Sequence, residues 1–307
     1  MSLDLFEEIM ELPDSSSQKR YAELVGLDDE KIYLQKQAAL LLNPGLLKQW
    51  SKDTYGKEIA LLKYFLKRPP LFIFSGDVGT GKTSLAETFG DSIARDGKIG
   101  VTVYRLSLKT RGDGTVGHMT KMIATAFEMV LAEAKKAQGK DRKPKQAIIL
   151  VIDEADALAQ SRESAQMHHE DRAGVNALIR GVDTIASEHL PVIVVMCTNR
   201  LSSMDPAVKR RAAMIFYFTR PNAAQRRYIL ETALADMGIT EQELQQLVVE
   251  TGETSDRDYG YTYSDIFQRL LPNILFSFFP DRRVDFKEVI ETTARAIPTA
   301  PFRDEMK

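Results

Sequence analysis

The sequence lacks most features of secreted and membrane proteins. Its 307 residues include one cysteine, Cys197, so no internal disulfide can form, and a reducing compartment is the simplest expectation. No apolar run approaches the roughly 20 residues that a transmembrane helix needs. The acidic N-terminus also lacks the basic and then apolar pattern of a signal peptide. These absences predict a cytoplasmic protein without a membrane segment.

An excess of charge of one sign is also absent. The formal net charge is -2, from 41 lysines and arginines and 43 acidic residues. No strong overall field therefore draws the chain toward nucleic acid or an anionic membrane. One basic stretch, residues 135–145, carries six basic residues and one acidic residue. No aromatic residue is interleaved with its charges, which favours a solvated connector over a nucleic-acid site.

Five short apolar runs punctuate the first two thirds of the chain. They occupy residues 71–74, 101–106, 148–152, 192–196 and 214–218. Runs of this length and composition predict strands, most of them buried on both faces of a parallel sheet. The segments between them, such as 84–94 and 119–135, have helical periodicity. This alternation predicts a doubly wound α/β domain.

The pattern changes after residue 220. Asn222 is a candidate helix cap, and the remaining apolar patterns all have helical spacing. We therefore divide the chain into a short leader at residues 1–20, a large α/β domain at 21–220 and a small helical domain at 221–307. Three phenylalanines of the helical domain are interpreted as core or as a subunit contact: Phe276, Phe278 and Phe279.

The most specific motif is a glycine-rich loop that follows the first predicted strand and precedes a helix. The loop and the first helical residue after it read Gly76, Asp77, Val78, Gly79, Thr80, Gly81, Lys82, Thr83 and Ser84. Glycines let backbone N–H groups converge on phosphates, and the helix N-terminus adds a favourable field for anions. Lys82 would neutralise the β and γ phosphates, and Thr83 would ligate Mg²⁺. The loop predicts a site for ATP with Mg²⁺.

A pair of carboxylates, Asp153 and Glu154, directly follows the third apolar run. Alone, such a pair is often a solvated strand end. After a phosphate loop, it is the expected second half of a hydrolytic site. Asp153 would support Mg²⁺, and Glu154 would orient or deprotonate the attacking water.

Two further polar elements follow later strands. Asn199 ends the run at 192–196, where it could reach the γ-phosphate or could simply form a turn. Arg210 and Arg211 precede the last run. They are either solvated surface charge or arginine fingers that stabilise charge on the nucleotide of a neighbouring subunit.

These elements occur in the order and spacing of AAA+ ATPases, and residues 21–300 resemble one AAA+ module. The resemblance implies a five-stranded α/β domain, a helical lid and a hexameric ring with ATP at the subunit interfaces. The resemblance also implies that Asn199 is the first sensor and that Arg210 and Arg211 form the arginine-finger region. It further implies that Val25 and Gly26 lie beside the adenine. Arg269 is either a second sensor or an ordinary surface arginine.

A narrower resemblance is to the pachytene-checkpoint/Trip-thirteen family. The similar segments are Asp171–Leu178, Gly181–Ile185, Arg211–Ala212 and Arg269–Pro272. This resemblance implies remodelling of a HORMA-domain protein. Short bacterial relatives accompany nucleotidyltransferases of the cGAS/DncV type in antiphage systems of the CBASS type. One departure is the stretch Lys109–Val116, which takes the place of the central-pore loop but lacks its usual aromatic residue.

Three functional hypotheses follow. The first is an ATP-hydrolysing homo-hexamer that disassembles or unfolds a HORMA-domain protein and so regulates its nucleotidyltransferase. The second is a DNA-associated ATPase, such as a loader or helicase accessory, which the charge balance supports little. The third is a non-enzymatic ATP switch or scaffold, and the intact Glu154 argues against it. We expect the first.

Overall fold

A computed structural model describes residues 5–43, 45–108, 118–137, 144, 146–158 and 168–302. The stretch Lys109–Val116, which replaces the pore loop, lies outside these residues, as does most of the basic connector. The described residues form two compact units. The sheet unit comprises those of residues 1–23, 27–75 and 83–217, and the lid unit comprises those of residues 24–26, 76–82 and 218–307. No helix among the described residues is long and apolar enough to cross a membrane.

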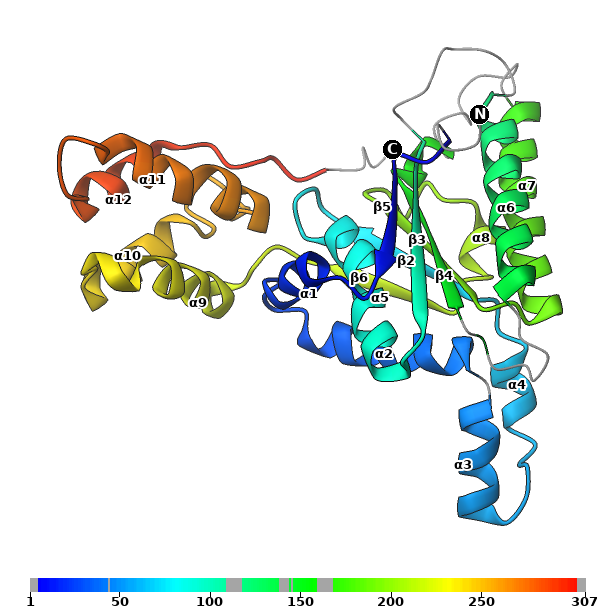
Figure 1. The fold of residues 1–307 in the computed structure, drawn as a ribbon. Helices are drawn as coiled ribbons and strands as arrows, with labels where there is room; N and C mark the ends of the chain where they lie inside the picture. Colours follow the sequence, from blue (N-terminus) through cyan, green and yellow to red (C-terminus); the bar gives the residue numbers. More distant parts are fainter. Residues whose placement is uncertain are drawn as a thin grey trace. The chain divides into compact units, whose positions relative to one another are not determined.

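A six-stranded sheet organises the sheet unit (Figure 1). Its strands are β1 Glu8–Leu12, β2 Leu71–Gly76, β3 Gly100–Ser107, β4 Gln146–Asp153, β5 Val192–Thr198 and β6 Met214–Phe218. Their order across the sheet is β1-β3-β4-β5-β2-β6. The pairs β3–β4, β4–β5 and β2–β5 are parallel. All five apolar runs therefore form strands, and the predicted α/β class is confirmed.

The sheet has one strand more than expected. Strand β1 pairs antiparallel with β3, with Met10 opposite Val103, and it lies inside the segment interpreted as a leader. Helix α1, Ser15–Ala22, follows it, and the side chain of Asp14 accepts a hydrogen bond from the Ser17 N–H to cap that helix. Most of β1 remains partly exposed because an edge strand has only one neighbour. Its mixed acidic and apolar sequence therefore lacks the continuous apolar run that marks a buried strand.

Helices cover both faces of this sheet (Figure 1). Helices α6, His118–Ala137, and α7, His168–Glu188, pack on the face that carries Ile148, Leu150 and Ile152. Helix α5, Lys82–Gly97, lies on the other face, where Gly90 approaches Ile149. Successive side chains of a strand point to opposite faces, so β4 needs apolar residues at every position between two helical layers.

Shorter elements complete the sheet unit. They are α2 Asp28–Leu42, α3 Gly45–Tyr55, α4 Leu62–Leu66, the 3₁₀ turn η2 Ala155–Leu158 and α8 Pro206–Lys209. Helix α8 begins with a proline, and the Asp205 carboxylate accepts the N–H of Ala207 to cap it. This short helix fixes the backbone immediately before Arg210.

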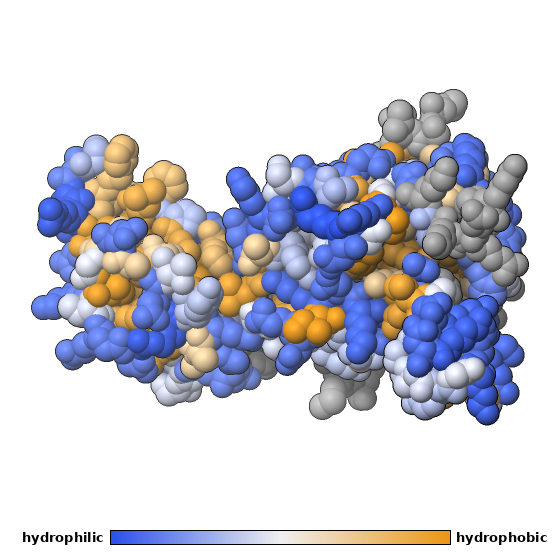
Figure 2. Space-filling model, turned by 60° about the horizontal axis from the view of Figure 1, so that its bottom comes forward, coloured by the Kyte–Doolittle hydropathy of each residue, from blue (hydrophilic) through white to orange (hydrophobic). Residues whose placement is uncertain are grey.

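The lid unit is helical, as predicted for the C-terminal part of the chain. Its elements are α9 Ala223–Leu234, η4 Ala235–Met237, α10 Glu241–Glu250, the π-helical turn η5 Asp265–Leu270, α11 Leu271–Phe278 and α12 Phe286–Arg295. Asn222 caps α9 in a capping box with Gln225, as its sequence position predicts. Phe278 is buried in the lid core, whereas Phe276 and Phe279 are exposed. Apolar patches therefore remain on the surface of this unit (Figure 2).

Gly181 controls the approach of α7 to α6, and this generates a stability prediction. A Cβ at this position would lie 2.2 Å from Cδ1 of Phe127, whereas a Cβ at Gly174 on the same helix would have no neighbour closer than 3.5 Å. We expect Gly181→Ala to lower the free energy of unfolding by about 1–3 kcal/mol through overpacking. Gly174→Ala, the matched control, should raise it by up to about 1 kcal/mol through helix propensity. Denaturant unfolding followed by circular dichroism measures both, and equal stabilities would contradict the packing argument.

Candidate nucleotide site

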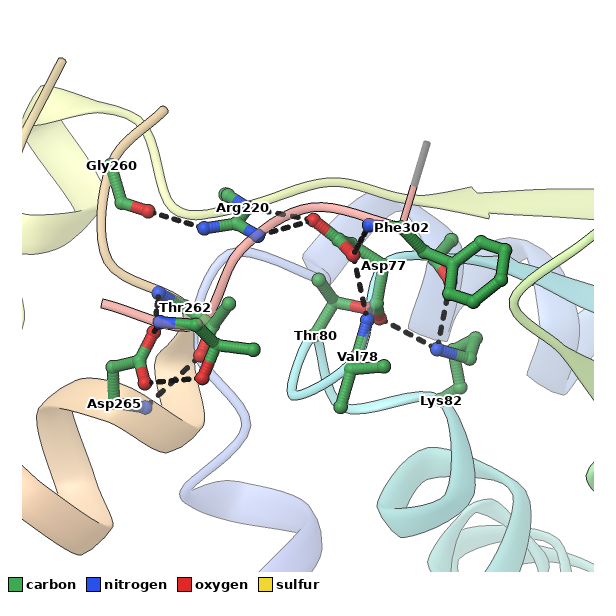
Figure 3. A network of polar contacts seen from close by, with 11 residues as sticks. Asp77, Val78, Thr80, Lys82, Arg220, Gly260, Thr262, Asp265 and Phe302 are labelled. Atoms are coloured by element: carbon green, nitrogen blue, oxygen red, sulfur yellow. Dashed lines mark hydrogen bonds and ion pairs between the residues drawn. The ribbon is translucent and has the colours of Figure 1, made fainter. Parts of the chain in front are cut away.

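The glycine-rich loop begins where β2 ends and runs into the first turn of α5 (Figure 3). Gly79 and Gly81 have φ angles of 73° and 93°, in the left-handed region that side chains disfavour. A Cβ at Gly79 would also lie 2.8 Å from Oγ1 of Thr262 and from Cβ of Ser264. The loop therefore passes close to two side chains from the C-terminal part of the lid unit, which leaves room only for glycine at Gly79.

The Lys82 side chain is folded into this loop. Its ammonium donates hydrogen bonds to the carbonyl oxygens of Gly76, at 2.9 Å, and Asp77, at 2.7 Å. The Thr80 hydroxyl donates to the same Asp77 carbonyl at 2.7 Å. Lys82 is 7% exposed, so these carbonyls replace part of the hydration that a buried ammonium loses. The result is a positive charge held inside the loop by two of its carbonyl groups, at the first residue of α5. A cation at a helix N-terminus suits a polyphosphate.

In the sheet unit, Thr83 and Asp153 form the arrangement expected of a magnesium site. The Thr83 hydroxyl donates to Oδ2 of Asp153 at 3.1 Å. The described residues contain no group of three or more His, Cys, Asp or Glu side chains that could hold a metal by themselves. One hydroxyl and one carboxylate fit Mg²⁺, because this ion keeps several waters and takes its other ligands from substrate phosphates. The residues present therefore fit a magnesium–nucleotide complex and do not form a metal cage.

Glu154 occupies a strained position at the end of β4. Its φ angle is 54°, which is uncommon for a residue with a side chain, and its N–H donates to Oδ1 of Asp153 at 2.8 Å. The Ser107 hydroxyl on β3 lies 3.4 Å from Oε2 of Glu154. Strain of this kind persists only where surrounding structure fixes it, and it concentrates at functional sites. The two successive carboxylates thus have different partners, Thr83 for Asp153 and Ser107 for Glu154.

Asn199 follows β5 at the same edge of the sheet. In the parallel pairing of β2 with β5, Ser75 lies opposite Thr198, and in that of β4 with β5, Ile152 lies opposite Met196. The residues after these strands therefore emerge side by side. The Thr198 hydroxyl accepts the N–H of Arg200 at 3.0 Å, which closes a turn around Asn199. Asn199 therefore lies in a turn and also at the sheet edge that carries the candidate site.

The two predicted finger arginines differ in their surroundings. Arg211 forms a bidentate ion pair with Asp183 on α7, at 2.9 and 3.1 Å, and also donates to the Ala207 carbonyl. The hydrogen bond to Asp183 raises the pKa of Arg211. Arg210 is exposed, and its guanidinium has no partner among the described residues. Arg211 is therefore anchored within its own chain, while Arg210 is exposed on the surface.

Three predicted nucleotide contacts belong to the lid unit. Val25 packs against the lid core, and the carbonyl of Gly26 accepts a hydrogen bond from the Gln225 side chain at 3.3 Å. Arg269 is 63% exposed and pairs with Asp265 at 3.2 Å. Burial opposes ionisation of Asp265, but hydrogen bonds from Thr262 and Thr299 lower its pKa overall. Arg269 is thus held by a carboxylate that is itself held by the lid.

Arg220 is a site residue that was not identified from the sequence. Residue 220 was used there only to mark the end of the large domain. Its guanidinium donates from Nε, at 2.8 Å, and from Nη2, at 2.5 Å, to Oδ2 of Asp77 in the loop (Figure 3). The partners are 143 residues apart in the chain. No local pattern marks such a pair. The only available signal was an acidic residue inside a loop that binds anions.

Comparisons with known proteins identify the family of this chain. The profile of the ATPase family associated with various cellular activities (AAA) matches residues 72–220. A relative from Escherichia coli, CD-NTase-associated protein 6, is 48% identical over 99% of this chain and 98% of its own length. A solved structure of an E. coli HORMA:CdnC:Trip13 complex contains a chain that is 47% identical, covers 99% of both chains and superposes with a TM-score of 0.90. A Trip13 structure from Rhizobiales is 41% identical over 96% of this chain and 100% of its own, with a TM-score of 0.73.

The similarity extends well beyond the phosphate loop. It covers nearly the whole of this chain in each of these relatives, including the helical C-terminal part that lies outside the matched family profile. The fold and about half of the sequence are thus shared with these relatives. The chain belongs to the AAA ATPase family, in the Trip13-like group that includes CD-NTase-associated protein 6.

Proposed function

We propose that this protein hydrolyses ATP with Mg²⁺ and uses the energy to remodel a HORMA-domain protein. The observation that carries the hydrolytic part is the convergence of Thr83 and Asp153 at 3.1 Å beside the strained Glu154. A hydroxyl, a carboxylate for the metal and a second carboxylate directed elsewhere are the groups that phosphoryl transfer to water requires. A passive nucleotide switch needs no such second carboxylate.

The chain's own residues divide the work as follows. Lys82 binds the β and γ phosphates, and Thr83 and Asp153 hold Mg²⁺, which when bound neutralises charge on the phosphate oxygens. Glu154 orients the attacking water and accepts its proton. Asn199 lies at the same strand edge, where its amide contacts the γ-phosphate or that water. Val25 and Gly26 contact the adenine, while Arg269, already paired with Asp265, is the weaker candidate for a second sensor.

The proposed partner follows from the relatives. The similar E. coli chain was solved in a complex whose components are HORMA, CdnC and Trip13. A HORMA-domain protein with its nucleotidyltransferase is therefore the substrate we assign here, in a bacterial antiphage system of the CBASS type. We further propose a homo-hexameric ring, which the exposed Arg210 and the apolar side chains exposed on the lid support. In the ring, Arg210 of one subunit acts on the nucleotide of its neighbour, while Arg211 stays paired with Asp183 of its own chain.

Replacement of the water-activating carboxylate tests the hydrolytic site. Glu154→Gln keeps the size and removes the base, so ATP binding should persist while turnover falls by roughly 10²–10⁴-fold. Phosphate release and equilibrium binding of a fluorescent ATP analogue give the two readouts. Glu133→Gln is the matched control, because Glu133 forms an exposed ion pair with Lys136 far along α6. Normal hydrolysis by Glu154→Gln would contradict the assignment of Glu154 as the residue that activates water.

The free arginine makes a separate prediction about neighbouring subunits. Arg210→Ala should lower kcat by about 10³-fold or more while ATP affinity is kept, as for arginine fingers in other ATPases and GTPases. Arg180→Ala, at another exposed arginine of the sheet unit, should leave kcat unchanged. Mixing Arg210→Ala chains with Glu154→Gln chains should restore part of the activity, since one chain supplies Glu154 and the other Arg210. If the mixture stays inactive although mixed assemblies form, action in trans is wrong.

Substrate identity is tested by trapping. Glu154→Gln chains loaded with ATP should retain a HORMA-domain protein in a pull-down from cells that also express a HORMA-domain protein and its nucleotidyltransferase. The Lys82→Ala variant, which loses phosphate binding, serves as the comparison and should retain much less. Recovery of DNA alone, in an ATP-dependent manner, would instead favour a DNA-associated ATPase.

A further inference from the structure

Asp77 is a carboxylate within the loop that is meant to receive a polyphosphate. All its acceptor positions are occupied (Figure 3). Oδ1 accepts the N–H groups of Val78 and Phe302, each at 3.0 Å. Oδ2 accepts two donors of Arg220. The Asp77 side chain is 16% exposed and that of Arg220 is 14% exposed, so little water screens this ion pair.

All three guanidinium nitrogens of Arg220 are engaged in this pair or with the lid. Its remaining terminal nitrogen, Nη1, donates to the Gly260 carbonyl at 2.5 Å, and its guanidinium lies 5.1 Å from the centre of the Tyr259 ring. Each of the three guanidinium nitrogens thus donates to Asp77 or to Gly260. These contacts direct Arg220 toward Asp77, and Arg220 acts on the loop through that carboxylate.

The electrostatic consequence concerns the incoming nucleotide. An unpaired carboxylate in the loop would repel the negative phosphates, and burial would strengthen that repulsion. Arg220 cancels the charge while leaving the carboxylate oxygens in place to organise the loop. The C-terminal segment after α12 adds to this organisation, because Thr299 is bonded to Asp265 at 2.7 Å and Phe302 to Asp77. Two carboxylates thus hold this segment against the lid and the phosphate loop.

We propose that Arg220 is a positioning residue for nucleotide binding, which neutralises Asp77 so that the phosphate loop can accept a polyphosphate, and that Asp77 also secures the C-terminal segment at Phe302. This inference rests on the proposed ATPase function. It predicts that the loss of nucleotide affinity in an Arg220 variant depends on the charge of Asp77. A purely structural ion pair has no such consequence for affinity.

A double-mutant cycle on the full chain tests the proposal. Arg220→Ala should weaken binding of ADP and ATP by about tenfold or more, raise KM and change kcat by less than about threefold, because Asp77 is left unpaired. Adding Asp77→Asn should return the affinity to within about threefold of wild type. Asp77→Asn alone should bind at least as tightly as wild type. Arg282→Ala, which removes the Arg282–Glu288 pair elsewhere in the lid unit, is the control.

Hydrogen exchange gives a readout independent of turnover. The amide of Phe302 should exchange faster in the Asp77→Asn and Asp77→Ala variants and at the wild-type rate in Arg282→Ala. If Arg220→Ala does not fold, Arg220→Gln replaces it in the cycle, since it also removes the charge. Unchanged affinity on loss of Arg220, or a loss that Asp77→Asn does not reverse, overturns the proposal. Absence of ATP binding and hydrolysis by the wild-type chain would instead overturn the proposed function.

Discussion

Burial of the central strands on both faces is the constraint that positions the chemistry of this protein. Strand β5 is buried along its whole length, and β4 is buried from Ala147 to Ile152. A charged side chain within these strands would have no water and no room for partners. The polar residues Asp153, Glu154 and Asn199 therefore appear only where the strands end. Parallel pairing then brings those ends to one edge, beside the end of β2 from which the phosphate loop departs.

A buried carboxylate near this edge is paired with two arginines. Glu87 on α5 is 5% exposed, and its burial raises its pKa, while Arg105 and Arg20 oppose the shift. A raised pKa means that ionised Glu87 costs stability as the pH rises through its titration, and the two arginines limit that cost. Arg105 also lies 3.9 Å from Oδ2 of Asp153. Arg105 thus lies close to the structural carboxylate of Glu87 and to Asp153, the carboxylate assigned to the metal.

Sequence reasoning succeeded where the determining pattern is local. Continuous apolar runs predicted the five strands, and Asn222 predicted the cap of α9 because its partner is three residues away. It missed β1, since an edge strand that stays partly exposed carries no continuous apolar run. It could not separate Arg210 from Arg211 either. Their difference depends on Asp183, which the fold brings to Arg211 from 28 residues away.

The pairing of Asp77 with Arg220 shows the same limit at the functional site. Read as a motif, the loop requires glycines, a lysine and a threonine, and it leaves the identity of residue 77 open. In the folded chain that residue supplies four acceptor contacts that shape the loop and one charge that opposes its ligand. In this fold the cation that pairs with the carboxylate is Arg220, a residue outside the motif. The functional loop therefore includes Arg220, although 143 residues separate Arg220 from Asp77.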